Sequence, residues 1–64
     1  MLVQIFDTEN GLIEIKEAIS FSQTHTRYRV TYWAGAGMVR VFAIKKENVK
    51  AVYINNKRYT GVKQ

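Results

Sequence analysis

The stretch RYRVTYWAGAGMVRVF, residues 27–42, predicts a β-hairpin around which the rest of the chain can be placed. Two runs rich in β-branched and aromatic residues flank the small residues AGAG. A four-residue loop over AGAG pairs Trp33 with Met38. Val30 then lies opposite Val41. This register also predicts the faces of both strands, because successive side chains of a strand point to opposite sides.

The predicted hairpin has one apolar face and one mixed face. The apolar face, which we expect to form the core, carries Tyr28, Val30, Tyr32, Val39, Val41 and Ala43. The mixed face carries Arg27, Arg29, Thr31, Trp33, Met38, Arg40, Phe42 and Ile44. Arginine pairs with phosphate and stacks on bases, and aromatic rings stack on unpaired bases. Cations interleaved with flat rings are therefore typical of sheets that bind single-stranded nucleic acid.

Two other interpretations of the mixed face stay open. In the first, the large apolar side chains pack beneath a neighbouring strand, and the arginine stems lie over them. In the second, the face is a protein–protein interface, because Trp, Met, Phe and Arg are enriched at such interfaces.

The remaining sequence reads as short strands separated by turns. Asn10-Gly11 is a strong hairpin signal, since both residues tolerate positive φ. A period-two alternation is interrupted at Glu17, where we expect a bend or bulge; a helical reading of that segment fits fewer residues. We expect a turn or one short helical turn near residues 45–49 and a tight turn at Asn55-Asn56. The predicted strands cover residues 2–6, 12–22, 27–33, 38–44, 49–54 and 57–62.

This pattern predicts an all-β fold: a small antiparallel barrel of five or six strands, or a curved meander sheet, in the SH3-like, Sm-like or OB-like size class. The chain of 64 residues is expected to form a single domain, residues 1–64. So short a chain has a thin core, and with no cysteine it has no disulfide to reinforce that core. Homodimerisation is therefore an open possibility.

Charge and the absence of catalytic motifs narrow the expected function. The net charge of +5 favours nucleic acid or an acidic protein as partner. The first residues resemble neither a signal peptide nor a membrane span, so we expect a cytoplasmic protein with no membrane partner. The glycines of AGAG are not followed by the Lys-Ser/Thr of a P-loop. His25 is the single histidine, and the acids show no catalytic spacing, so we expect no enzyme activity, cofactor or metal.

The first hypothesis is a small basic nucleic-acid-binding module that favours single strands. Basic residues of the C-terminal third would extend the mixed face into a phosphate track. The candidate residues are Arg27, Arg29, Trp33, Arg40, Phe42, Lys45, Lys46, Lys57 and Arg58. The alternative is a non-enzymatic protein-interaction module, such as a phage or accessory inhibitor or adaptor, that docks its basic and aromatic face on an acidic partner.

Overall fold

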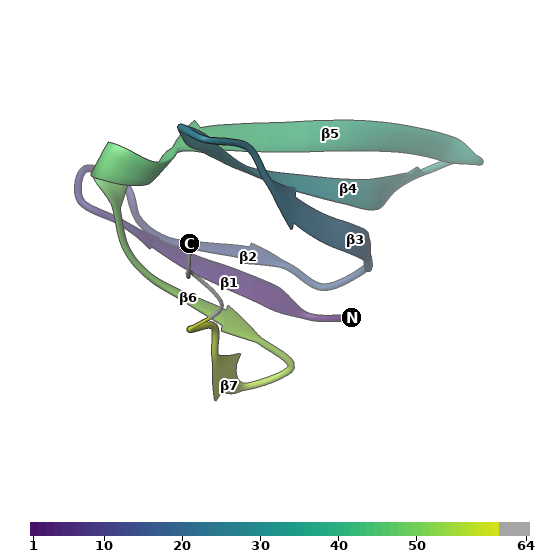
Figure 1. Ribbon diagram of the computed structural model, residues 1–64. Coiled ribbons are helices and arrows are strands. Elements are labelled where there is room, and N and C mark those ends of the chain that lie inside the picture. The colour runs from purple at the N-terminus through teal and green to yellow at the C-terminus, as the bar shows by residue number, and fades with distance from the viewer. Residues whose placement is uncertain (61–64) are drawn as a thin grey trace.

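The computed structural model describes residues 1–60, which form antiparallel strands and one short 3-10 turn (Figure 1). The turn, η1 (Lys46–Asn48), lies within the segment predicted to hold one. The all-β antiparallel class is therefore confirmed. Residues 61 and 62 of the predicted last strand lie outside the described residues. The strands are β1 (Val3–Asp7), β2 (Gly11–Ile15), β3 (Ala18–Gln23), β4 (Arg27–Gly35), β5 (Met38–Lys45), β6 (Val49–Ile54) and β7 (Lys57–Arg58).

The strands lie in two sheets that face each other. One sheet has the order β2-β1-β6-β7, and the other has the order β3-β4-β5. In Figure 1 the three-stranded sheet is the upper layer and the four-stranded sheet the lower one. Within residues 1–60 the sheets do not join into a closed barrel, so β5 and β2 each end a sheet.

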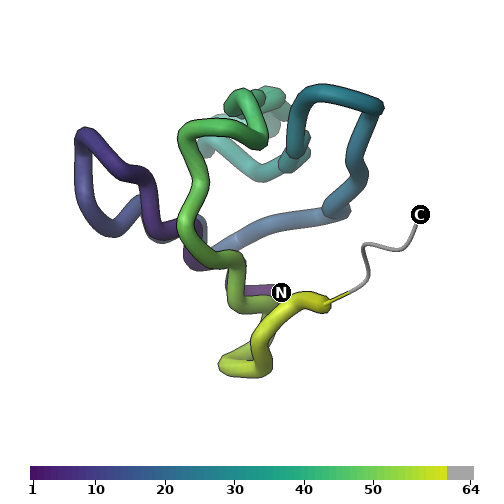
Figure 2. Tube along the Cα trace, turned by 60° about the vertical axis from the view of Figure 1, so that its left-hand side comes forward, coloured from purple at the N-terminus to yellow at the C-terminus, as the bar shows by residue number. Residues whose placement is uncertain are grey.

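Two connections carry the chain between the layers. The first is at Lys16-Glu17, where the predicted strand 12–22 divides into β2 and β3. Continuing the alternation would direct the Glu17 carboxylate toward the core, and the turn leaves it exposed instead. Met1 holds this turn with two backbone hydrogen bonds to Ala18, of 2.9 and 3.0 Å. The second connection is η1, seen in Figure 2 as the green segment descending from the upper layer to the lower.

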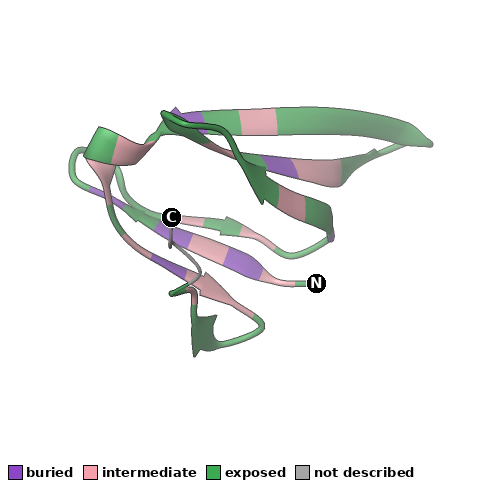
Figure 3. Cartoon of the chain, viewed as in Figure 1, coloured by how far each residue is buried: buried purple, intermediate pink, exposed green. Residues whose placement is uncertain are grey.

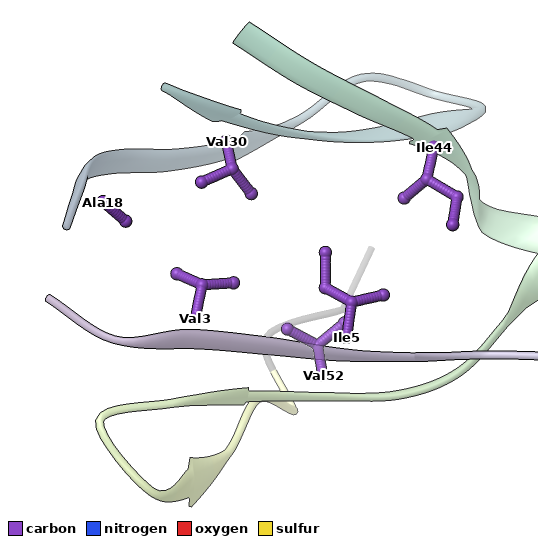
Figure 4. Close-up of a cluster of buried hydrophobic side chains, with 6 residues drawn as sticks. All are labelled: Val3, Ile5, Ala18, Val30, Ile44 and Val52. Carbon is purple, nitrogen blue, oxygen red and sulfur yellow. The ribbon is translucent and has the colours of Figure 1, made fainter. Parts of the chain in front are cut away.

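Among residues 1–60, six buried apolar side chains form the centre of the core between the layers. Figure 4 shows Val30 and Ile44 of the upper sheet pointing toward Val3, Ile5 and Val52 of the lower one, with Ala18 at the side. In β1 the inward positions alternate with more exposed ones, as expected for a strand with one face on the core (Figure 3). The core is thin, as the chain length predicts.

The turns at the ends of the four-stranded sheet follow the sequence signals. Asn10-Gly11 lies at the β1–β2 hairpin, where the buried Asp7 carboxylate accepts hydrogen bonds from Glu9 N (3.1 Å) and Asn10 Nδ2 (2.8 Å). Asn55 and Asn56 form the predicted tight turn between β6 and β7, with φ of 51° and 67°. Asparagine is among the few residues that adopt this conformation readily.

The β4–β5 hairpin turns through two residues rather than the predicted four. Ala36 and Gly37 both have positive φ, of 51° and 72°, as in the two-residue turns that match the twist of the flanking strands. β4 continues to Gly35, and the register shifts by one residue between Trp33 and Gly35. A bulge of this kind leaves one extra residue in one strand. Trp33 therefore lies opposite Val39, one residue away from its predicted partner.

This one-residue slip turns β5 over and corrects the predicted core. Val39 and Val41, predicted to be buried, are each 50% exposed, and Ala43 is exposed beside them. Phe42 and Ile44, predicted to face away from the core, belong to it: Ile44 is buried and Phe42 packs against the buried cluster. Because side chains alternate along a strand, a shift of one residue exchanges every position of β5.

β4 keeps its predicted faces. Val30 is fully buried, and Tyr28 and Tyr32 are half-buried on the same side. Arg27 and Arg29 lie on the reverse side and are exposed, as predicted. The prediction for the hairpin is therefore correct for one strand and reversed for the other.

Candidate nucleic-acid interface

The three-stranded sheet presents one surface to solvent, which we call the outer face. Its cations and its tryptophan come mainly from β4, its hydroxyl groups from β3 and β4, and its aliphatic side chains from β5. Strand alternation and the register place on it Ser20, Ser22, Arg27, Arg29, Thr31, Trp33, Val39, Val41, Ala43 and Lys45.

The charges of the outer face are all positive among the residues that the structure describes. Arg29 lies at its centre, between Ser22 of β3 and Ala43 of β5. Arg27 and Lys45 form the adjoining pair at the end of the β4–β5 ladder. All three side chains are exposed. Small neighbours leave room around the Arg29 guanidinium, which can therefore contact an anion lying flat on the sheet.

Trp33 lies near the opposite end of the same face. It is 50% exposed, and its strand neighbour Val39 is equally exposed. The Trp33 backbone N–H donates to the carbonyl of Glu17 (3.1 Å), which ties this part of β4 to the turn between the layers. This hydrogen bond fixes the backbone that carries the Trp33 ring. The exposed part of the side chain remains available for a base to stack on.

The sequence did not predict the aliphatic part of the outer face, because its valines were expected to be buried. Val39 and Val41 make β5 apolar on its solvent side as well, at the edge of the sheet. The signal that could have revealed them is the sequence Ala36-Gly37 read as a two-residue turn, since such turns are the commonest hairpin connections.

Two predicted site residues on β5 do not belong to the outer face. Phe42 lies opposite Val30 and packs on the core, so its ring is not available for stacking on this surface. Arg40 lies opposite Tyr32, on the side of the hairpin that faces the lower layer. Both corrections follow from the register slip.

Two further predicted residues lie on the other sheet. Lys57 and Arg58 form β7 and pair with Ile54 and Tyr53 of β6. β7 lies at the bottom of Figure 1, on the far side of the molecule from β5. The last hairpin therefore folds beside β6, and not beside β5 as a continuous phosphate track requires.

Lys46 occupies an intermediate position at the start of η1. Its side chain is half-buried, and its ammonium nitrogen lies 5.3 Å from the centroid of the Tyr28 ring. The Tyr28 ring in turn stacks on Phe21 and meets the edge of Tyr59. These contacts hold the lysine stem at the end of the sheet, near Lys45 but outside the outer face.

A surface pocket of about 450 Å³ lies where the β3–β4 turn, the end of β5 and η1 come together. Its walls combine three cations with a single carboxylate and two other polar side chains. The lining residues are His25, Thr26, Arg27, Lys45, Lys46 and Glu47. Arg27 and Lys45 belong both to this pocket and to the outer face, so the two features are continuous.

Two further observations on residues 1–60 concern metal-ligand clusters and long apolar helices. Within residues 1–60 no three His, Cys, Asp or Glu side chains gather as metal ligands. Over the same range, no helix is long and apolar enough to cross a membrane.

Comparison with known proteins gives no family model, no curated protein and no solved structure that matches this chain.

Proposed function

We propose that this protein is a small nucleic-acid-binding module that holds single-stranded nucleic acid on the outer face of the β3-β4-β5 sheet. The observation that carries the proposal is the presence of a half-exposed Trp33 on the same strand face as Arg27 and Arg29. Phosphate contacts by arginine and stacking of bases on a ring are the two interactions from which single-strand binding is built.

The dimensions of the face suit a short segment of strand. Arg27 and Trp33 are six residues apart in β4 (33 − 27), which corresponds to about 20 Å at the usual rise of a strand. A single strand following β4 would place phosphates at Arg27 and Arg29 and a base on Trp33.

Single strands are favoured over duplex because four of the ten outer-face residues are apolar: Trp33, Val39, Val41 and Ala43. The face carries Val39 and Val41 beside the tryptophan ring, and unpaired bases can cover these groups with their own flat faces. Duplex DNA presents mainly phosphate and sugar to a flat sheet, so it would leave these apolar side chains without partners.

The first test is a fluorescence titration of the wild-type protein, in which Trp33 is the only tryptophan. Single-stranded oligonucleotides should quench it saturably, more strongly than duplex of the same sequence and more weakly at higher salt. Absence of quenching by every oligonucleotide at low salt would reject the proposal.

Variants then separate stacking from charge, with labelled oligonucleotides as the probe. Trp33→Ala should lose about 1–3 kcal/mol of binding free energy with an unchanged salt slope, and Trp33→Phe should recover part of it. Arg29→Gln should lower the slope of log K against log salt by about 0.7. Arg58→Gln is the matched control, since this exposed arginine lies on the other sheet and should leave the slope unchanged. Equal slopes for the two arginine variants would contradict the assignment.

The solvent side of β5 supports a second candidate, a protein-interaction module without enzyme activity. Val39 and Val41 lie on a strand that ends its sheet, and an acidic partner could cover them while pairing with the adjacent cations. A folded Trp33→Ala variant that binds oligonucleotides like the wild type, yet no longer retains an acidic protein in a pull-down, would favour this candidate.

A further inference from the structure

The last paired rung of the β4–β5 ladder places two like charges opposite each other. Arg27 is the direct partner of Lys45, and both side chains are exposed. Opposite charges across a rung stabilise an antiparallel pair, whereas like charges destabilise it. A third cation, Lys46, follows at once in η1. An anion bound between these groups would convert the repulsion into attraction.

Backbone hydrogen bonds hold the frame around these cations. Thr24 N donates to the Arg27 carbonyl (2.8 Å), and Arg27 N donates to Thr24 Oγ1 (3.1 Å), which closes the β3–β4 turn. Lys46 N donates to the carbonyl of Thr26 (2.8 Å), which joins that turn to η1. The lysine side chain is further held by its contact with the Tyr28 ring. The hydrogen bonds that set the turn and η1 thus do not use the charged groups of Arg27, Lys45 and Lys46.

The pocket provides the donors that a phosphate group needs. Arg27 offers a guanidinium, Lys45 and Lys46 offer ammonium groups, and Thr26 adds a hydroxyl at the same wall. The single carboxylate of the lining is Glu47, which is exposed, so three cations outweigh one anion. For Arg27 and Lys45 the structure records no ion pair with a carboxylate of residues 1–60. Their charges are therefore available to an external anion.

We propose that this pocket binds a terminal phosphate monoester of the single strand that lies on the outer face. The inference rests on the proposed function, because Arg27 and Lys45 are shared by the two sites. A monoester suits the pocket better than an internal diester for two reasons. It carries about −1.5 to −2 charges at neutral pH, against three cations and one carboxylate, and it has three oxygens free to accept hydrogen bonds. The pocket also lies where the sheet ends, so the strand would begin there and run toward Trp33.

The test is a competition assay with short oligothymidylates of about six nucleotides. Each is prepared with a 5′-phosphate, with a 3′-phosphate or with hydroxyl groups at both ends, and each displaces the same labelled strand from the wild-type protein. One of the two phosphorylated forms should compete about tenfold more strongly than the hydroxyl form. The preferred end assigns the direction of the strand.

Lys46→Gln tests the pocket separately from the outer face, because Lys46 lines the pocket and does not belong to the outer face. This variant should lose the preference for the phosphorylated end and keep the wild-type affinity for the hydroxyl form. Lys46→Arg should retain the preference. The matched control Lys57→Gln removes an exposed lysine from the other sheet and should change neither quantity.

Failure of the pocket and failure of the proposed function give different results. If all three oligothymidylates bind with equal affinity and still quench Trp33, the pocket assignment is overturned and the outer face stands. If no oligothymidylate binds, both proposals are overturned. A phosphoserine peptide that binds in a Lys46-dependent manner, while the phosphorylated strands show no advantage, also overturns the assignment and makes the site a phosphopeptide pocket.

Discussion

Val30→Ala and Val41→Ala make the same chemical change on adjacent strands of one sheet, and we expect very different effects on stability. Val30 is fully buried, whereas Val41 is 50% exposed. Val30→Ala removes the equivalent of two buried methylene groups, at about 0.8 kcal/mol each, and leaves a cavity, for a total near 2–3 kcal/mol. Val41→Ala loses half of that transfer energy with no cavity, plus some β-propensity, for a total of about 1 kcal/mol.

Thermal and urea unfolding of the two purified variants measure this difference. A chain of this length has a total stability of about 3–10 kcal/mol, so Val30→Ala removes a large share of it and should lower the melting temperature by roughly 10–20 °C. Val41→Ala should shift by roughly 5 °C. A four-residue hairpin loop places both valines in the core, opposite each other. Equal losses of 2 kcal/mol or more in the two variants would therefore refute the two-residue turn and, with it, the composition of the outer face.

Two further predictions concern the turns. Gly37→Ala should cost about 1–2 kcal/mol from backbone strain alone, because Gly37 has φ of 72° while a Cβ built there meets no atom within 4 Å; a much larger loss in urea melts would instead mean crowding at the turn. Asp7→Ala should cost about 1–3 kcal/mol, because the buried carboxylate accepts hydrogen bonds from Glu9 N and Asn10 Nδ2. Asp7→Asn keeps an acceptor for the bond from Glu9 N and should lose less in the same melts; an equal loss would show that this bond contributes little to stability.

Local sequence signals predicted a turn or a strand face correctly where it depends only on the residues within that segment. Asn10-Gly11 and Asn55-Asn56 mark turns, and both turns are present: Gly11, Asn55 and Asn56 have the positive φ that glycine and asparagine tolerate. The charge of Glu17 on an apolar strand face predicted a bend or bulge, and a turn lies there, although the change of sheet at this turn was not predicted. The faces of β4 follow from its own alternation, which is why Arg29 and Val30 lie on the predicted sides.

The candidate site was predicted only in part, because it depends on how strands pair. Trp33 and Arg29 share a strand, so alternation alone places them on one face. Phe42 belongs to the partner strand, and its face depends on a single residue of the hairpin loop. Lys57 and Arg58 lie on the other sheet because β6, the strand before them, pairs with β1.

The sequence by itself determined the all-β class, the turns at Asn10-Gly11 and Asn55-Asn56 and the two faces of β4, since each depends on the conformational preferences and alternation of neighbouring residues. The tertiary structure alone decided the register of β5, the exposure of Val41 and the meeting of Arg27, Lys45 and Lys46 around one pocket. The physical reason is that a one-residue bulge costs little locally, whereas it exchanges the faces of an entire strand. The packing of Phe42 and Ile44 in the core stabilises the register that the two-residue turn at Ala36-Gly37 allows.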